Sequence, residues 1–171
     1  MSRLVILGAG GYGRTVADVA EQLGLFESIC FLDDGQTGDG ILGTCADYLR
    51  FADRETYMYP AFGNNTARLD WLDKLARAGI PTVTLIHPSA YVSPRAQVEE
   101  GTVILPKAVV NTGCHIGRGS IINLGAIVDH GCILEPGVHV CLGAIVKAEN
   151  HIPGAMKIEA GQVIENRTYP L

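Results

Sequence analysis

Between Ile86 and Tyr169 a branched aliphatic residue returns at every sixth position without a break. A period of six matches neither the 3.6-residue repeat of a helix nor the alternation of a strand. It is typical of a solenoid, and it predicts a β-helix in which three hexads close one coil. Each aliphatic side chain would then stack on its equivalent eighteen residues away. The fourteen positions are Ile86, Val92, Val98, Ile104, Val110, Ile116, Ile122, Val128, Leu134, Val140, Val146, Ile152, Ile158 and Ile164.

The residues between these aliphatics suit sharp corners. A glycine stands three positions before the next aliphatic in eight hexads, from Gly101 to Gly161. Glycine tolerates backbone angles that a tight corner requires. A twisted sandwich of short strands is the alternative, and fourteen unbroken hexads argue against it. The position after this glycine site is mostly small, as at Ala90, Ala96, Thr102, Ala108, Cys114, Ser120, Ala126, Cys132 and Ala144.

The composition excludes several classes of function. With 47% hydrophobic and 18% charged residues, a packed core is expected rather than disorder. A net charge of −5 without a basic run argues against a nucleic-acid partner, and no apolar segment is long enough for a membrane span. Glycines interrupt the first residues too soon for a signal peptide, so we expect a cytoplasmic protein. The cysteines show no CxxC spacing, and we interpret Cys114 and Cys132, one coil apart, as space-filling residues.

The first third of the chain has the pattern of a βαβ unit. Residues 3–7 are apolar and predict a buried strand, followed by Gly10, Gly11 and Gly13 within a GxGxxG sequence. A helical pattern at 15–23 and a second strand at 28–32 come next, and Asp33 and Asp34 follow. Such glycines let backbone N–H groups and a helix N-terminus approach a phosphate, and the aspartates could accept hydrogen bonds from a ribose or a base.

The remaining residues before the hexads complete a half-sized nucleotide fold. We expect a short helix at 46–53, a strand at 56–62, a helix at 66–78 and a fourth strand at 82–86. Asn64 either caps the helix at 66–78 or faces the same crevice as the glycines. A full dinucleotide fold needs two such halves, which favours one mononucleotide-sized ligand over NAD. We therefore predict a Rossmann-like half-domain at 1–85 and an all-β, parallel β-helix at 86–171.

Four histidines lie in the solenoid. His115 and His151 are two coils apart with Ile133 between them, so a shared zinc ion, as in a β-helix carbonic anhydrase, is a minor alternative and no metal is expected. His130 lies at a corner beside Asp129, and the column places Lys147 above Asp129 as a possible ion-pair partner.

Position 148 lies one coil above His130, about 4.8 Å away along the stack. Ala148 is small and would leave its backbone N–H open to a ligand beside the imidazole. Acyl transfer needs a base that takes a proton from the attacking group and an N–H that stabilises the developing oxyanion.

Taken together, the chain resembles the sugar acetyltransferases that include UDP-4-amino-sugar N-acetyltransferases and sialic-acid O-acetyltransferase homologues. These are left-handed β-helix, hexapeptide-repeat acyltransferases, so the resemblance implies that the parallel β-helix at 86–171 is left-handed. The resemblance covers almost the whole chain and rests on a combination of motifs. They are Gly8-Ala9-Gly10-Gly11-Tyr12-Gly13-Arg14, Phe31-Leu32-Asp33-Asp34, Gly63-Asn64-Asn65 with Arg68, Leu85-Ile86-His87-Pro88-Ser89-Ala90, and Asp129-His130 with His139.

The resemblance implies a site shared by two domains. The N-terminal domain would hold a nucleotide-linked sugar, through Gly10, Gly11, Tyr12, Gly13, Arg14, Asp33, Asp34 and Asn64. His130 would be the general base. Acetyl-CoA, as co-substrate, would lie between subunits of a homotrimer, near His139 and the N–H groups close to Gly143 and Ala148.

The chain departs from the family at two of these positions. Tyr12 stands where the family often has histidine, and Gly131 follows His130 where some members have an acid, so Asp129 or a water would orient the ring. The last residues also end the hexads earlier than in most members.

We therefore predict an acetyl-CoA-dependent acetyltransferase that acts on an amino group, or a hydroxyl, of a nucleotide-linked or free sugar in bacterial surface-glycan biosynthesis. The alternative is a non-catalytic nucleotide-sugar-binding or scaffold protein with a shortened CoA groove.

Overall fold

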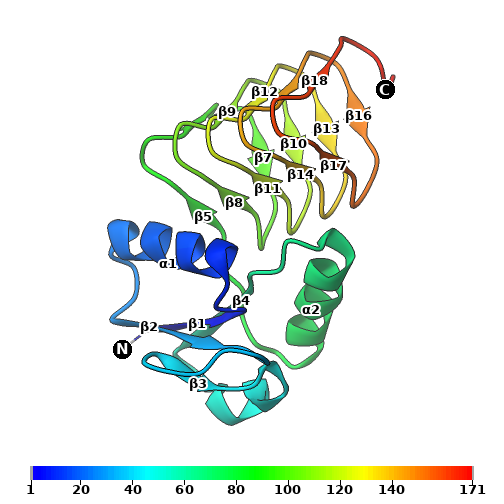
Figure 1. Ribbon diagram of the computed structural model, residues 1–171. Helices are drawn as coiled ribbons and strands as arrows, with labels where there is room; N and C mark the ends of the chain where they lie inside the picture. Colours follow the sequence, from blue (N-terminus) through cyan, green and yellow to red (C-terminus); the bar gives the residue numbers. More distant parts are fainter. Residues whose placement is uncertain (1, 171) are drawn as a thin grey trace. The chain divides into compact units, whose positions relative to one another are not determined.

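The computed structural model describes residues 2–170 and contains two compact units, Met1–Val83 and Thr84–Leu171 (Figure 1). The first unit is a parallel four-stranded sheet with helices, and the second is a solenoid of two-residue strands. Each unit has its own buried core.

The first unit has the strand order β3-β2-β1-β4, with all neighbours parallel. Because the strands are parallel, their carboxyl ends and the loops that follow them meet at one edge. The predicted βαβ unit is confirmed, and β3 is a strand that the sequence pattern did not reveal. The elements are β1 (Arg3–Leu7), α1 (Gly11–Leu23), β2 (Ser28–Leu32), β3 (Ile41–Gly43), the 3-10 helix η1 (Cys45–Phe51), β4 (Thr56–Pro60) and α2 (Asn65–Arg77).

Apolar periodicity explains the helices, and two expected strands differ from the structure. Helix α1 buries Val16 and Val19 on one side and ends at Gly24, whose φ of 63° is left-handed. Strand β4 ends at Pro60, which lacks the N–H that a further ladder bond would need. The expected strand at 82–86 is wrong as one element. Thr82 forms an isolated bridge with Met58, whereas Leu85–Ile86 is β5 and pairs with β8 of the solenoid.

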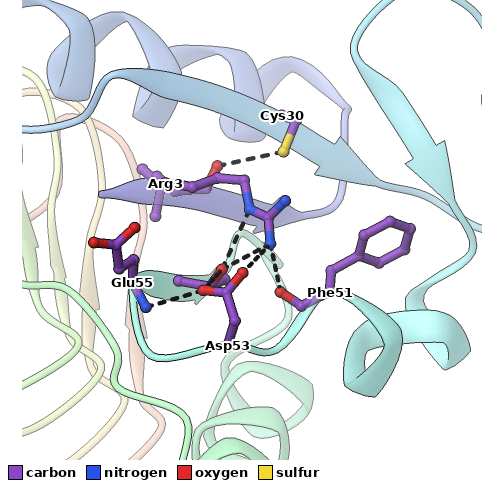
Figure 2. A network of polar contacts seen from close by, with 7 residues as sticks. Arg3, Cys30, Phe51, Asp53 and Glu55 are labelled. Atoms are coloured by element: carbon purple, nitrogen blue, oxygen red, sulfur yellow. Dashed lines mark hydrogen bonds and ion pairs between the residues drawn. The ribbon is translucent and has the colours of Figure 1, made fainter. Parts of the chain in front are cut away.

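A polar network joins the amino ends of the strands in the first unit (Figure 2). Arg3 Nη2 donates to the Phe51 carbonyl at 2.8 Å and to Asp53 Oδ2 at 3.0 Å. Its Nη2 and Nε also reach Thr56 Oγ1, at 2.8 and 3.2 Å. The network therefore secures the edge of the sheet opposite to the glycine turn.

The solenoid has three faces, and each face is a stack of parallel two-residue strands (Figure 1). Paired residues such as Ile122 and Val140 are eighteen apart, which confirms three hexads per coil and the left-handed β-helix class. Face 1 contains β5 (Leu85–Ile86), β8 (Val103–Ile104), β11 (Ile121–Ile122), β14 (His139–Val140) and β17 (Lys157–Ile158). Face 2 contains β6 (Tyr91–Val92), β9 (Val109–Val110), β12 (Ile127–Val128), β15 (Ile145–Val146) and β18 (Val163–Ile164). Face 3 contains β7 (Gln97–Val98), β10 (His115–Ile116), β13 (Ile133–Leu134) and β16 (His151–Ile152).

The corners repeat one backbone conformation. From Gly101 onwards, every sixth residue has a positive φ, and eight of these residues are glycine. The other four are Lys107, Glu149, Ala155 and Arg167, with φ between 54° and 63°. The hexad geometry therefore imposes a left-handed residue at each of these corners, whatever the side chain.

Face 2 has an apolar outer surface. Its outward column is Tyr91, Val109, Ile127, Ile145 and Val163, and Tyr91, Ile127 and Val163 are 55%, 36% and 43% exposed. Leu124 and Leu142 add 39% and 50% exposed side chains at the corner between faces 1 and 2.

Candidate active site

His130 is exposed at the corner between faces 2 and 3, two residues after the end of β12. Asp129 fixes this corner, because its Oδ1 accepts the His130 N–H at 2.7 Å and Asn111 Nδ2 at 3.0 Å. The bond from Asn111, followed by that from the His130 N–H, holds the pKa of Asp129 below its usual value. Asp129 is therefore a carboxylate at neutral pH, adjacent to the imidazole in the chain.

The expected ion pair between Asp129 and Lys147 is wrong. Lys147 Nζ lies 2.5 Å from Glu165 Oε2, one coil further on. Asp129 is instead bonded to Asn111, one coil earlier. The side chains of this column therefore pair in twos along the stack.

The backbone N–H of Ala148, a residue that is 6% exposed, has no hydrogen-bond partner within residues 2–170. In the two preceding coils, the residue before this position caps the equivalent N–H with its own side chain. Asn111 Oδ1 accepts the Thr112 N–H at 2.8 Å, and Asp129 does the same for His130. The Lys147 side chain carries no acceptor, and the Ala148 N–H donates no hydrogen bond within residues 2–170. One coil from His130, the chain thus leaves one donor without an internal partner.

Neither Gly143, at the corner that follows β14, nor His139, in β14 itself, lies at the corner that carries His130 and Ala148. Gly143 follows β14, between faces 1 and 2, and its N–H already donates to the Leu124 carbonyl at 2.9 Å. Gly143 itself therefore offers no free N–H, and the expectation of N–H groups close to Gly143 beside the thioester stays a prediction. His139 lies on face 1, and its Nε2 is 3.0 Å from Asn123 Nδ2. Within one chain, the residues expected to hold the co-substrate are divided between two corners.

Asn123 was not identified from the sequence. Its Oδ1 accepts the Leu124 N–H at 2.8 Å, which leaves Nδ2 as the donor to His139. His139 Nε2 therefore carries the lone pair. An asparagine sixteen residues before His139, directly after the strand that pairs with β14, is the signal that could have shown this pair.

In the first unit, the glycines of the β1–α1 turn serve two purposes. Gly8 has a φ of +102°, and a Cβ on Gly13 would lie 1.9 Å from the Gly8 carbonyl oxygen, so both are required by the turn itself. A Cβ on Gly10 or Gly11 would meet nothing within 4 Å. Packing therefore does not explain why these two positions lack a side chain, and their glycines leave open space at the N-terminus of α1.

The side chains beside this turn differ in exposure. Tyr12 OH lies 2.7 Å from Tyr59 OH, and burial, with Tyr59 as a neighbour, raises the pKa of the Tyr12 hydroxyl. Tyr12 is therefore tied to β4. Arg14 is exposed, with its guanidinium 5.8 Å from the centre of the Phe31 ring.

Asp33 and Asp34 hold loops in place. Asp33 accepts the N–H groups of Ala9, Gly35 and Gln36 at 2.7, 2.9 and 2.8 Å. These bonds, from Ala9 first, hold the pKa of Asp33 below its usual value. Asp34 Oδ1 accepts the Cys45 N–H at 2.8 Å. The loops that they fix line a solvent-open cavity of about 260 Å³, formed by residues 33–38 and 41–44.

Asn64 follows β4 at the same edge of the sheet and caps α2. Its Oδ1 accepts the Ala67 N–H at 2.9 Å. Arg68 is fully buried and donates from Nη1 to the Phe62 carbonyl and from Nη2 to Asn65 Oδ1, both at 2.8 Å. The glycine turn, the aspartates and Asn64 therefore all follow carboxyl ends of parallel strands, where open α/β sheets bind ligands.

The other solenoid histidines form separate pairs. His115 Nε2 is 2.7 Å from Glu99, His151 Nε2 is 2.6 Å from Glu135, and Ile133 lies between the two histidines in the register. Across residues 2–170 no three His, Cys, Asp or Glu side chains are grouped to hold a metal. In the same range, no helix has the length and apolar character needed to cross a membrane.

Comparison with known proteins matches both units. Residues 3–75 match the family described as PglD N-terminal domain. The acetyltransferase domain of PglB from Neisseria gonorrhoeae is 34% identical, with a TM-score of 0.94 over 98% of this chain and 84% of that one. The same domain in complex with acetyl coenzyme A has a TM-score of 0.92, with 34% identity over 96% and 82% of the two chains.

A third structure is a histidine-to-alanine mutant of GDP-perosamine N-acetyltransferase from Caulobacter crescentus, in complex with CoA and GDP-perosamine. It is 26% identical, with a TM-score of 0.83 over 97% of this chain and 90% of that one. Because the PglB acetyltransferase domain is 34% identical over 98% of this chain, the chain belongs to the sugar acetyltransferase family.

Proposed function

We propose that the protein transfers an acetyl group from acetyl-CoA to an amino group of a nucleotide-linked sugar, with His130 as the general base. One observation supports this most directly. An exposed histidine lies one coil below an N–H that has no partner within residues 2–170. Two relatives, solved with acetyl coenzyme A and with CoA plus GDP-perosamine, support the choice of substrates.

The reaction follows from these two groups. The sugar amine attacks the thioester carbonyl carbon and a C–N bond forms, while His130 accepts the proton that the nitrogen loses. The carbonyl oxygen becomes negative and is stabilised by the Ala148 N–H. The C–S bond then breaks, the thiolate of CoA leaves and takes up a proton, and the amide remains. Asp129, fixed by Asn111, places a carboxylate next to the imidazolium that forms.

The nucleotide would bind to the first unit. Gly10 and Gly11 leave space where the N–H groups of α1 can meet a phosphate. The 260 Å³ cavity lined by Asp33 and Asp34 suits a base and ribose, and Asn64 follows β4 at the same end of the sheet. Asp33 and Asp34 act there first by shaping the loops.

A complete acetyl-CoA site would need a homotrimer. If face 2 of each subunit turns its apolar column towards a three-fold axis, each corner between faces 2 and 3 meets a neighbour's corner between faces 1 and 2. His130 and Ala148 of one subunit would then face the partner subunit's His139 and the partner subunit's Asn123. The exposed Tyr91, Ile127 and Val163 would be buried in the same step. We place this enzyme in the cytoplasm and in bacterial surface-glycan biosynthesis.

The first test is titration calorimetry with acetyl-CoA, combined with acetyl transfer to a panel of UDP-, dTDP- and GDP-linked 4-amino sugars. We expect binding, turnover of at least one sugar, and a loss of roughly 10²-fold or more in kcat for His130→Ala, with acetyl-CoA binding kept. A His130→Ala variant with wild-type kcat would refute the assigned base, and absence of acetyl-CoA binding would refute the proposed reaction.

A second variant tests the donor. Lys147→Asn supplies the side-chain oxygen that Asn111 and Asp129 supply in the other coils, and this oxygen would occupy the Ala148 N–H. We expect kcat to fall by roughly 10²-fold, the effect of losing one oxyanion donor, without loss of stability. Lys147→Met removes the charge but adds no acceptor, and it is the matched control. Equal kcat for the two variants would remove Ala148 from the mechanism.

A further inference from the structure

Asn150 is a fully buried polar residue in a column of small residues. It occupies the corner position that Cys114 and Cys132 occupy in the preceding coils, and its side chain is 0% exposed. Its Nδ2 donates to the Lys147 carbonyl at 2.8 Å and to the Glu165 carbonyl at 2.9 Å. Its Oδ1 accepts the Tyr169 N–H at 2.9 Å. A buried amide is costly unless its groups are bonded, and both polar atoms of this side chain are bonded.

The bond to the Lys147 carbonyl determines where the Ala148 N–H points. A trans peptide is planar, so its C=O and N–H point in opposite directions. The Lys147 carbonyl is directed into the corner, where it accepts from Asn150 Nδ2 and also from Cys132 Sγ at 3.2 Å. The N–H of the same peptide, that of Ala148, must therefore point out of the solenoid.

The coil below shows why this peptide needs an extra anchor. There, Cys114 Sγ donates to the Asp129 carbonyl at 3.0 Å, and the His130 N–H is capped by Asp129 Oδ1. The peptide between Asp129 and His130 is thus held at both ends. The peptide between Lys147 and Ala148 has no cap on its N–H side, and Asn150 adds a second bond on its carbonyl side.

We propose that Asn150, assisted by Cys132, is a positioning residue that aims the Ala148 N–H at the oxygen of the reacting thioester. The inference rests on the proposed function, in which this N–H stabilises the oxyanion. Neither side chain touches substrate. Both act through the Lys147 carbonyl.

The test measures kcat and KM for acetyl-CoA, by release of the CoA thiol, with the panel sugar that the wild type acetylates. We expect Cys132→Ala and Asn150→Leu to lower kcat by roughly 10-fold, part of the 10²–10³ for a complete loss of the donor. KM for acetyl-CoA and the shape of the pH profile of kcat should stay unchanged, because His130 is untouched. Cys132→Ser retains a donor and should recover most of kcat.

Thr102→Val is the matched control for a purely structural effect. Thr102 Oγ1 donates to the Gly117 carbonyl at 3.3 Å, fifteen residues on, the same separation as from Cys132 to Lys147, but at the corner between faces 3 and 1. If the Cys132 and Asn150 variants lose no more kcat than Thr102→Val, or if Cys132→Ser is as slow as Cys132→Ala, the inference is overturned.

The proposed function and the positioning role of Asn150 and Cys132 can be rejected separately. Should Asn150→Leu not fold, the Ala and Ser variants of Cys132 decide alone. A normal kcat for Lys147→Asn would reject the oxyanion donor, and with it the proposed mechanism. A slow Lys147→Asn together with normal Cys132 and Asn150 variants would reject the positioning role only.

Discussion

Ala155→Gly should stabilise the solenoid. Ala155 has a φ of 56° at a corner where eight equivalent positions are glycine. A left-handed conformation costs a residue with a Cβ about 1–2 kcal/mol. Glycine avoids this cost but loses about 0.5–1 kcal/mol of additional conformational entropy on folding. The difference predicts a gain of about 0.5–1 kcal/mol in the free energy of unfolding.

Thermal and urea unfolding measure this gain. For a chain of this size, about 0.5–1 kcal/mol corresponds to a rise of roughly 1–4 °C in Tm. The Ala155 N–H that donates to the Pro136 carbonyl is kept by the substitution, so the coil-to-coil bond is not a variable.

Ala144→Gly is the matched control, because it makes the same chemical change where no positive φ is present. Ala144 is fully buried in the core column, so the variant should lose about 1–2 kcal/mol through chain entropy and the buried methyl group. A lower Tm for Ala155→Gly, or equal effects of the two substitutions, would refute the claim that the hexad imposes strain at its corner.

Three further predictions concern single contacts. Asp33→Asn should lower the free energy of unfolding by about 1–3 kcal/mol near pH 7. Because the pKa of Asp33 is depressed in the folded protein, the difference between wild type and variant is fully present above the unfolded pKa of about 3.9. In urea unfolding, this difference should disappear as the pH falls through the folded pKa. Gly117→Ala would place a Cβ 2.7 Å from the Leu134 carbonyl oxygen and neighbouring backbone atoms. The free energy of unfolding, measured by circular dichroism, should fall by about 3 kcal/mol or more, and a wild-type melting curve would contradict this packing. Asn111→Leu removes the bond to Asp129 Oδ1 and should lower kcat by roughly three- to tenfold at unchanged KM for acetyl-CoA, and an unchanged kcat would show that this bond does not support catalysis.

Much of the architecture was predictable because it depends on local periodicity. A β-helix buries an apolar residue at every sixth position when a small residue or a glycine stands at the corner between two such positions. The glycine turn, the amphipathic α1 and the acidic residues after β2 were likewise readable, since each depends on neighbours close in the chain. The same reasoning identified His130 and Ala148 as neighbours in adjacent coils, because position along the stack follows directly from counting in eighteens.

The allocation of hydrogen bonds was decided by the tertiary structure. Lys147 pairs with Glu165 rather than Asp129, because the carboxylate of Asp129 is already bonded to Asn111 and to its own corner. The Gly143 N–H donates to the Leu124 carbonyl. Such choices depend on side-chain rotamers and on which neighbour reaches an atom first, and a column of residues does not specify them.

The sequence by itself thus determined the solenoid, its coil length and the corner that carries His130. Only the tertiary structure showed which N–H groups make coil-to-coil bonds, and that the Ala148 N–H makes none within residues 2–170. The physical reason is that apolar periodicity reports which side of the chain is buried, whereas an available donor is defined by the partners that it lacks. Asn150 shows both: the sequence reveals a polar residue in a column of small ones, and only the structure shows which carbonyl groups its side chain bonds.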